Sequence, residues 1–147
     1  MLKILVSACL LGENCKYNGK NNLNEKVISL QEKCILIPIC PEVLGNLPTP
    51  RIPSEVCGEE VFDREGKNVT KNFQTGAYKA LQKALNNHIH YALLKEKSPS
   101  CGVKYRYDGT FTGTVIEDSG ITTKILQEHN IKVFSELEID ELLKEIA

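Results

Sequence analysis

The stretch that decides how this chain is interpreted is His90-Tyr91-Ala92-Leu93-Leu94-Lys95-Glu96-Lys97-Ser98-Pro99-Ser100-Cys101-Gly102. Its first five residues form a compact apolar run that is typical of a buried strand. Pro99 fixes its own φ and pushes Ser98 toward an extended conformation, while Gly102 allows the backbone to approach a ligand closely. Two hydroxyls and a thiol are therefore displayed on a stiff loop at a strand end, which indicates a functional site.

Outward from this strand, short apolar runs alternate with helical patterns. This alternation predicts a single three-layer α/β domain over residues 1–147, with a mainly parallel, Rossmann-like or flavodoxin-like sheet of four or five strands. We expect the second strand to lie at one edge, followed in space by the first, third and fourth. The strands are expected at 3–9, 34–39, 89–94 and 131–134, and the helices at 24–33, 70–87, 121–129 and 135–146.

Between the second strand and the long helix lies a segment rich in proline and glycine, from Pro41 to Pro53. Such a segment inside a small domain is typical of a stiff functional loop. We expect Arg51 and Glu55 to form an ion pair that holds it in place. Hairpins are expected around Arg64-Glu65-Gly66 and around Asp108-Gly109.

Composition limits the possible partners. The chain has 147 residues, 25% of them charged, and a formal net charge of -1, so it has no general attraction to nucleic acid or acidic membranes. No apolar run approaches the ~20 residues that a spanning helix needs. The apolar start is short and reads as a strand rather than a signal peptide, so we expect a cytoplasmic protein with a small-molecule partner.

Three of the six cysteines fall at predicted strand ends. Cys9 closes the first strand, Cys40 closes the second, and Cys101 lies just beyond the third. The carboxyl ends of parallel strands share one edge of a sheet, and ligands bind there where the strand order reverses, so we expect these thiols to converge. Three thiolates could hold an iron–sulfur cluster or a zinc ion, and either would keep one coordination position open for a substrate.

The remaining cysteines have other interpretations. Cys34 begins a buried strand and is most simply a small core residue. Cys57 has no partner in register and is interpreted as a bystander. Cys15 could be a fourth ligand, a resolving thiol or a packed loop residue. The three histidines show no metal-binding spacing, and we assign them no role.

Two further residues are candidates for proton transfer. Glu42, two residues after Cys40, could act as a general base toward water, or it could cap a helix or pair with Arg51. Ser98 could donate a proton or hold the substrate, or its hydroxyl could only make a turn hydrogen bond. Lys16, Arg51 and Ser100 are possible substrate or loop contacts.

Five ordered motifs carry a family resemblance. They are Ser7–Gly12, Cys15–Gly19, Cys40–Glu42, Pro50–Pro53 and Ser98–Gly102, and they span nearly the whole chain. Together they resemble the DUF523 family, which includes the thiouracil desulfidases.

This resemblance implies a [4Fe-4S] cluster held by Cys9, Cys40 and Cys101, with one open iron for the sulfur of a thiolated uracil or thiouridine nucleotide. It also implies acid/base roles for Glu42 and Ser98, and a hydrolytic reaction that releases sulfide without net redox change. The chain departs from the family pattern at Lys16, where arginine is usual, and at Gly45-Asn46, where two glycines are usual.

Two other functions remain open from the sequence. The first is a non-catalytic thiol or redox sensor that holds a cluster or zinc, with Cys15 as the partner of Cys9. The second is a nucleotide- or RNA-binding module, which the absence of a basic stripe with aromatic residues disfavours. If the substrate is a nucleotide, Lys16, Lys95 and Lys97 are candidates to contact its phosphate.

Overall fold

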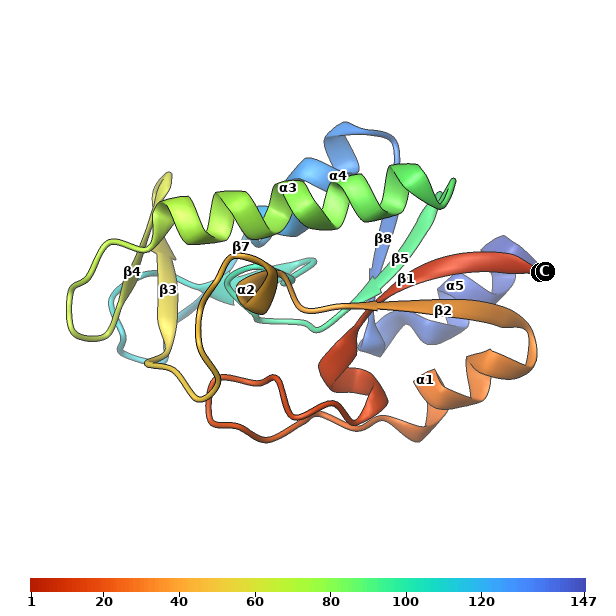
Figure 1. Ribbon diagram of the computed structural model, residues 1–147, viewed down its shortest axis with the longest axis horizontal. Coiled ribbons are helices and arrows are strands. Elements are labelled where there is room, and N and C mark those ends of the chain that lie inside the picture. Colours follow the sequence, from red (N-terminus) through yellow and green to blue (C-terminus); the bar gives the residue numbers. More distant parts are fainter.

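The computed structural model describes residues 1–147 and contains a parallel sheet covered by helices on both faces (Figure 1). Four strands form this sheet in the order β2-β1-β5-β8, which confirms the predicted order. Their bounds are Leu2–Ser7 for β1, Cys34–Ile39 for β2, Tyr91–Leu94 for β5 and Lys132–Ser135 for β8. The predicted three-layer α/β class is therefore correct.

Five α-helices accompany the sheet. They are α1 (Glu25–Ser29), α2 (Pro41–Leu44), α3 (Thr70–Asn86), α4 (Ile121–Glu128) and α5 (Ile139–Ile146). Short 3-10 turns follow β1, α1 and β8, and the last of these begins with a capping box at Ser135 and Glu138. The short helix α2 was not predicted, because four residues are too few to show a helical period.

Alternation along β1 divides the core in two. Leu5 points to the face covered by α3 and α4, where it joins Ala80, Ala92 and Leu126. Ile4 and Val6 point to the opposite face and pack with residues of α1 and α5, including Val27 and Leu142. Successive strand side chains point to opposite faces, so a strand with apolar residues at every position requires a layer on each side. Cys34 is buried in the second of these clusters, as predicted.

Two small antiparallel hairpins lie beside the carboxyl ends of the central strands, on the side away from the termini (Figure 1). The first pairs β3 (Ser54–Cys57) with β4 (Glu60–Asp63), and the second pairs β6 (Tyr105–Tyr107) with β7 (Val115–Glu117). The first hairpin turns at Gly58 and Glu59, earlier than predicted, and the expected turn near Gly66 follows it as a separate one. Phe73 and three valines form a third apolar cluster under this hairpin.

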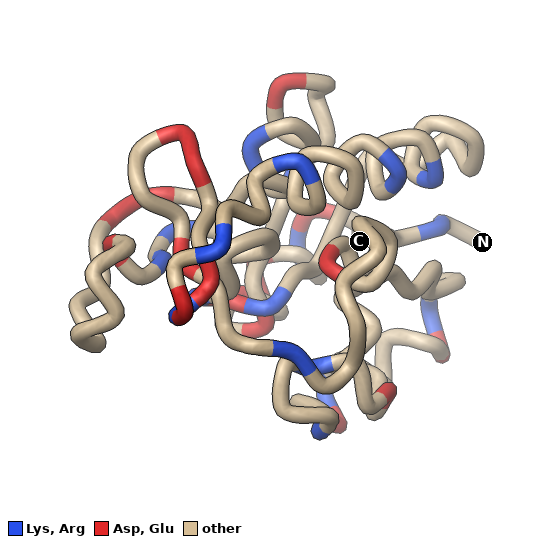
Figure 2. The backbone as a smooth tube through the Cα atoms, turned by 60° about the vertical axis from the view of Figure 1, so that its left-hand side comes forward, with Lys and Arg blue, Asp and Glu red and all other residues tan.

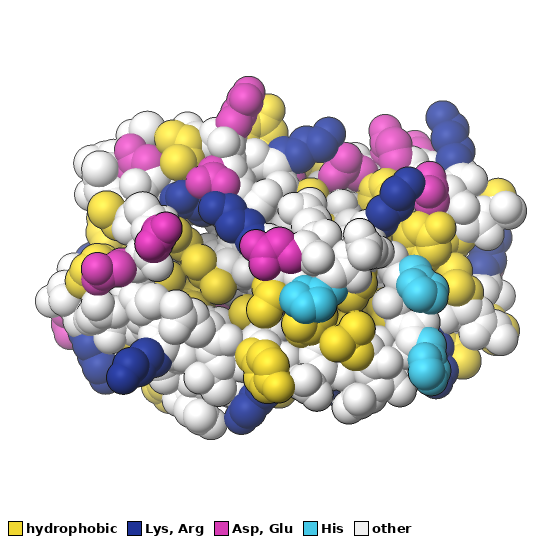
Figure 3. All heavy atoms as spheres, turned by 90° about the horizontal axis from the view of Figure 1, so that it is seen from above, with side chains coloured by type: hydrophobic (Ala, Val, Ile, Leu, Met, Phe, Trp, Pro, Cys, Tyr) yellow, Lys and Arg dark blue, Asp and Glu magenta, His cyan; other side chains and the backbone are white.

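Charged positions of both signs are interspersed along the backbone (Figure 2). The face formed by α3 and α4 presents apolar side chains between charged ones (Figure 3). None of the helices has the length and apolar character required to cross a membrane.

Candidate active site

A cavity lies where β1, β2 and β5 end. It has a volume of about 470 Å³. It opens between the sheet and the two hairpins. It lies beside the topological switch point at β1, where β2 is added on one side of β1 and β5 on the other. Every site residue named from the sequence lines it: Cys9, Cys40, Cys101, Glu42, Ser98, Lys16, Arg51 and Ser100.

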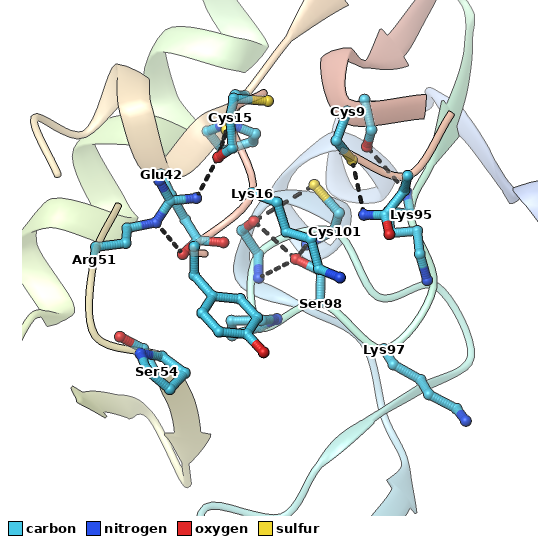
Figure 4. Close-up of a pocket in the computed structure, with 18 of the residues that line it drawn as sticks. Cys9, Cys15, Lys16, Glu42, Arg51, Ser54, Lys95, Lys97, Ser98 and Cys101 are labelled. Atoms are coloured by element: carbon cyan, nitrogen blue, oxygen red, sulfur yellow. Dashed lines mark hydrogen bonds and ion pairs between the residues drawn. The ribbon is translucent and has the colours of Figure 1, made fainter. Parts of the chain in front are cut away.

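Figure 4 shows how these residues surround the cavity, with Arg51 and Glu42 on one side, Cys9 and Lys95 on the other, and Cys101 and Ser98 between them. The floor is buried: Cys101 is 4% exposed and Ser100 is 1% exposed. Cys15 also lines the cavity, whereas Cys57 is exposed at the end of β3 and takes no part in it.

Cys40 and Glu42 are held by the short helix α2. Cys40 is the N-cap of this helix and Pro41 occupies its first turn, where a missing N–H costs no hydrogen bond. The helix lies directly on α3, because a Cβ placed at Gly76 would be 1.8 Å from the carbonyl oxygen of Pro41. The Asn72 amide donates to the Gly45 carbonyl at 2.8 Å. Close packing against α3 therefore fixes where Glu42 enters the cavity.

Asn46, one of the departures from the family pattern, has a φ of 70°. Glycine adopts this left-handed conformation freely, and asparagine tolerates it better than most residues do. The substitution is therefore compatible with the turn that ends α2.

Arg51 pairs with Glu42 rather than with Glu55. Its Nε lies 3.1 Å from Glu42 Oε1, and its Nη2 donates to the Cys15 carbonyl at 2.8 Å. The predicted Arg51–Glu55 pair is wrong, because Glu55 accepts the N–H groups of Gly109 and Phe111 at 3.0 and 3.1 Å. Arg51 thus connects the cavity carboxylate to the Cys15 segment, and Glu55 holds the turn between β6 and β7.

Burial raises the pKa of Glu42, and hydrogen bonds and charge from Arg51, together with the Ser100 hydroxyl, only partly oppose this effect. Carboxyl groups with raised pKa values are stronger bases than ordinary ones once ionised. The Ser98 and Ser100 hydroxyl oxygens lie 3.2 Å apart, so Ser98, Ser100 and Glu42 form a connected polar chain.

The loop that carries Ser98 and Cys101 is organised by the buried carboxylate of Glu96. This carboxylate accepts the backbone N–H groups of Lys97, Val103, Lys104 and Tyr105 at 2.7 to 3.3 Å. A single side chain therefore fixes both ends of the loop.

The start of α4 supports the same loop from the other side. The Ile121 and Thr122 N–H groups donate to the carbonyls of Pro99 and Ser100 at 3.1 and 2.8 Å, and Thr123 Oγ1 donates to the Cys101 carbonyl at 2.9 Å. Ser98 Oγ accepts the N–H of Cys101 at 3.1 Å, which is the turn hydrogen bond considered from the sequence. This bond leaves the Ser98 hydroxyl hydrogen available for other partners.

The cysteines occupy different electrostatic environments. Hydrogen bonds from Cys15 and from the Val43 N–H lower the pKa of Cys40 to about 7, against burial, which raises it. Burial raises the pKa of Cys101 to about 12, and burial also raises that of Cys9. Cys40 is therefore the thiol most readily ionised in the metal-free protein.

The cysteine arrangement fits an iron–sulfur cluster. All six cysteines are free, and Cys9, Cys40 and Cys101 line one cavity. Thiolates are the ligands of iron–sulfur clusters, so the residues present are suited to hold such a group.

The cavity also has residues that sequence reasoning did not select: Asn22, Arg64, Tyr107 and Phe111. Arg64 lies 5.8 Å from the centre of the Phe111 ring, and Lys16 lies 5.8 Å from that of Tyr17. These residues come from loops and hairpins far apart in the chain, so no local spacing could have identified them together.

Comparison with known proteins places this geometry in a family. The model of the 2-thiouracil desulfurase family matches residues 4–138, so the chain belongs to that family. A solved structure with 42% identity, the [4Fe-4S]-dependent thiouracil desulfidase TudS (DUF523Vcz), superposes with a TM-score of 0.93 over 99% of this chain and 98% of its own. The uncharacterized protein YbbK of Bacillus subtilis (strain 168) is 39% identical over 150 residues, covering 95% of this chain and 99% of its own.

Proposed function

We propose that the protein is a [4Fe-4S]-dependent desulfidase that removes sulfur from a thiolated pyrimidine by hydrolysis and releases sulfide. The observation that carries this proposal is the gathering of three free cysteines, one partly buried carboxylate and one serine hydroxyl in a single cavity. The match to TudS and to the 2-thiouracil desulfurase family supports it. Six free cysteines suit a reducing compartment, so we place the protein in the cytoplasm.

Cys9, Cys40 and Cys101 would hold the cluster. An iron without a cysteine ligand supplies a soft Lewis acid that polarises a thiocarbonyl group. The protein supplies the proton transfers. Glu42 takes a proton from a water molecule, whose oxygen bonds to the ring carbon as the carbon–sulfur bond breaks. The Ser98 hydroxyl delivers a proton to the ring or to the departing sulfide. It recovers a proton from Glu42 through Ser100, because the Ser100 hydroxyl contacts both Ser98 and Glu42.

Unpaired cations at the cavity mouth indicate a phosphorylated substrate such as a thiouridine monophosphate. Of the five basic residues that line the cavity, Arg51 pairs with Glu42 and Lys95 pairs with Glu136. Lys16, Arg64 and Lys97 make no ion pair. Three free cations around one cavity attract a multiply charged anion in a protein whose net charge is only -1.

Sulfide release from thiouracil and from thiouridine monophosphate, measured anaerobically at equal iron content, tests the proposal. General acid–base groups contribute about 10²–10⁴-fold, so Glu42→Gln and Ser98→Ala should lower turnover by about that factor while keeping the cluster. Glu13→Gln, an exposed carboxylate outside the cavity, is the control. Full activity in both cavity variants would remove these residues from the mechanism.

The contact between Cys15 and Cys40 supports a second candidate, a non-catalytic thiol sensor. The same assay separates the two functions. A cluster-loaded protein that releases no sulfide from any thiolated pyrimidine would favour the sensor.

A further inference from the structure

Each of the three candidate cluster cysteines has one side-chain hydrogen-bond donor beside its sulfur. Asn22 Nδ2 lies 3.4 Å from Cys9 Sγ, and Ser100 Oγ lies 3.4 Å from Cys101 Sγ. Cys40 Sγ contacts the Cys15 carbonyl at 3.7 Å, and this contact brings the Cys15 thiol, a further donor, next to Cys40. The three donors are an amide, a hydroxyl and a thiol from different loops, so the pattern does not arise from one repeated local motif.

We propose that Asn22 and Cys15 are positioning residues whose hydrogen bonds to Cys9 and Cys40 raise the reduction potential of the bound cluster and help to retain it. The inference rests on the proposed function, because it requires a cluster at these cysteines. Ser100 supplies the corresponding bond to Cys101, but its additional contacts with Ser98 and Glu42 make it a less specific probe.

The Asn22 amide is held in place from both sides. Its own backbone N–H donates to the Cys9 carbonyl at 2.9 Å. Two residues further on, the Asn24 N–H donates to the Leu10 carbonyl at 3.0 Å. Asn24 also caps α1 by accepting from the Lys26 and Val27 N–H groups. These backbone hydrogen bonds hold residues 22–24 against residues 9 and 10. The Asn22 side chain is therefore directed at the Cys9 sulfur by its own backbone.

Cys15 is anchored by Arg51, which donates to its carbonyl at 2.8 Å. In the metal-free protein, Cys40 Sγ also contacts this carbonyl, at 3.7 Å, which requires a thiol hydrogen. A cysteine that ligates iron has lost that hydrogen and can only accept. A hydrogen bond between these two side chains in the cluster-bound protein would therefore run from the Cys15 thiol to the Cys40 sulfur.

Hydrogen bonds to ligating sulfurs withdraw electron density from them, and they are among the factors that set cluster potentials. Withdrawal of density favours the reduced state of the cluster, so each donor shifts the potential in the positive direction. It also leaves less negative charge on the sulfurs, which opposes oxidation of the cluster. Donors to Cys9 and Cys40 act at the two ligands that are partly exposed, whereas Cys101 is buried.

The test is a reduction potential, measured by dye-mediated titration of the reconstituted protein and followed by electron paramagnetic resonance. Asn22→Ala and Cys15→Ala should each shift the potential in the negative direction. Loss of a group that hydrogen-bonds to a metal ligand typically weakens metal binding by about 10–100-fold. Release of iron from these variants to a chelator should accelerate accordingly. Both readouts are independent of turnover.

Two matched variants separate the donor from the loop that carries it. Asn21→Ala removes the neighbouring amide, which bonds Asn14 rather than a sulfur, and should leave the potential unchanged. Cys15→Ser keeps a hydrogen-bond donor at the same position and should keep the wild-type potential. Thermal melting of the metal-free variants shows that each one is folded.

Unchanged potential and retention in both Asn22→Ala and Cys15→Ala, at equal iron, would overturn the inference. An equal shift in Asn21→Ala would also overturn it, because loop conformation would then be the cause. Failure of the wild type to assemble a cluster is a different result, and it would reject the proposed function itself.

Discussion

The two sides of the cavity are built differently. The Cys101 wall, residues 96–104, is mostly buried, with Glu96 only 4% exposed, and it is tied to a buried carboxylate and to the start of α4. The Cys9 wall, residues 9–22, is partly exposed, and its Tyr17 is 41% exposed. Its internal hydrogen bonds are mainly backbone turns and exposed asparagine contacts.

This difference assigns separate tasks to the walls. Local stability follows burial and the protection of backbone hydrogen bonds, so the Cys101 wall should open rarely and the Cys9 wall more often. The rigid wall carries Ser98 and Ser100, whose hydroxyls would need fixed positions for the proposed proton transfer. The looser wall carries Lys16 and Tyr17 at the cavity mouth, where a substrate must enter and leave.

The largest expected effect comes from breaking the rigid wall with Glu96→Gln. All four N–H groups reach Glu96 Oε1, and that of Lys104 also reaches Oε2. An amide oxygen carries no charge and the amide NH2 group cannot accept from Lys104, so the four bonds become weaker. We expect the free energy of unfolding to fall by about 2–4 kcal/mol, measured by urea denaturation of the metal-free protein. Glu13→Gln makes the same exchange on the Cys9 wall and should change stability by less than about 0.5 kcal/mol. Equal effects would show that the two walls do not differ.

A middle-sized effect is expected from Arg51→Lys, which loosens the tie between the Cys9 wall and Glu42. Lysine cannot reproduce the separate bonds that Arg51 makes to Glu42, Thr49 and the Cys15 carbonyl. Stability should fall by about 1–2 kcal/mol, and amide hydrogen exchange should accelerate at residues 15–17 but not at 98–101. Arg64→Lys, at an exposed site without an ion pair, should leave both measurements unchanged. Acceleration across both walls would mean that Arg51 acts on the whole molecule.

The smallest effect concerns pH and the hairpin beside the rigid wall. Burial raises the pKa of Asp118, but Lys124, the Ser119 N–H and Arg106 outweigh it and hold the pKa below its usual value. Because the folded pKa is the lower one, the stabilisation is complete above the unfolded value and is lost as pH falls through the folded value. Between pH 6 and pH 3, Asp118→Asn should therefore lose less stability than the wild type in urea titrations. A steeper loss in the variant would contradict this assignment.

Periodicity made the layers of the fold predictable, because a strand such as residues 3–7 with apolar residues on both faces allows few other architectures. The cavity position followed from the same argument, since Cys9, Cys40 and Cys101 each come after a parallel strand. The resemblance to a known family, rather than spacing, supplied the expectation of a cluster.

The details that depend on long-range contacts could not be predicted. Arg51 was expected to pair with Glu55, and its pairing with Glu42 was considered only as an alternative role of Glu42; packing of α2 on α3 decides for Glu42. Glu96 looked like an ordinary charged residue after a strand, and its role depends on a loop that folds back around it. Asn22 had no signal at all, because its partner sulfur is brought close only by the turn that follows β1.

The separation of the cysteines along the chain also has a consequence for biosynthesis. Positions 9, 40 and 101 follow three strands that lie side by side only after the crossovers between them are complete. No short segment emerging from the ribosome holds two of these thiols at the same cavity, unlike a zinc finger, whose ligands are local and whose metal drives folding. A cluster held by these three cysteines would therefore be assembled on a chain that has already folded.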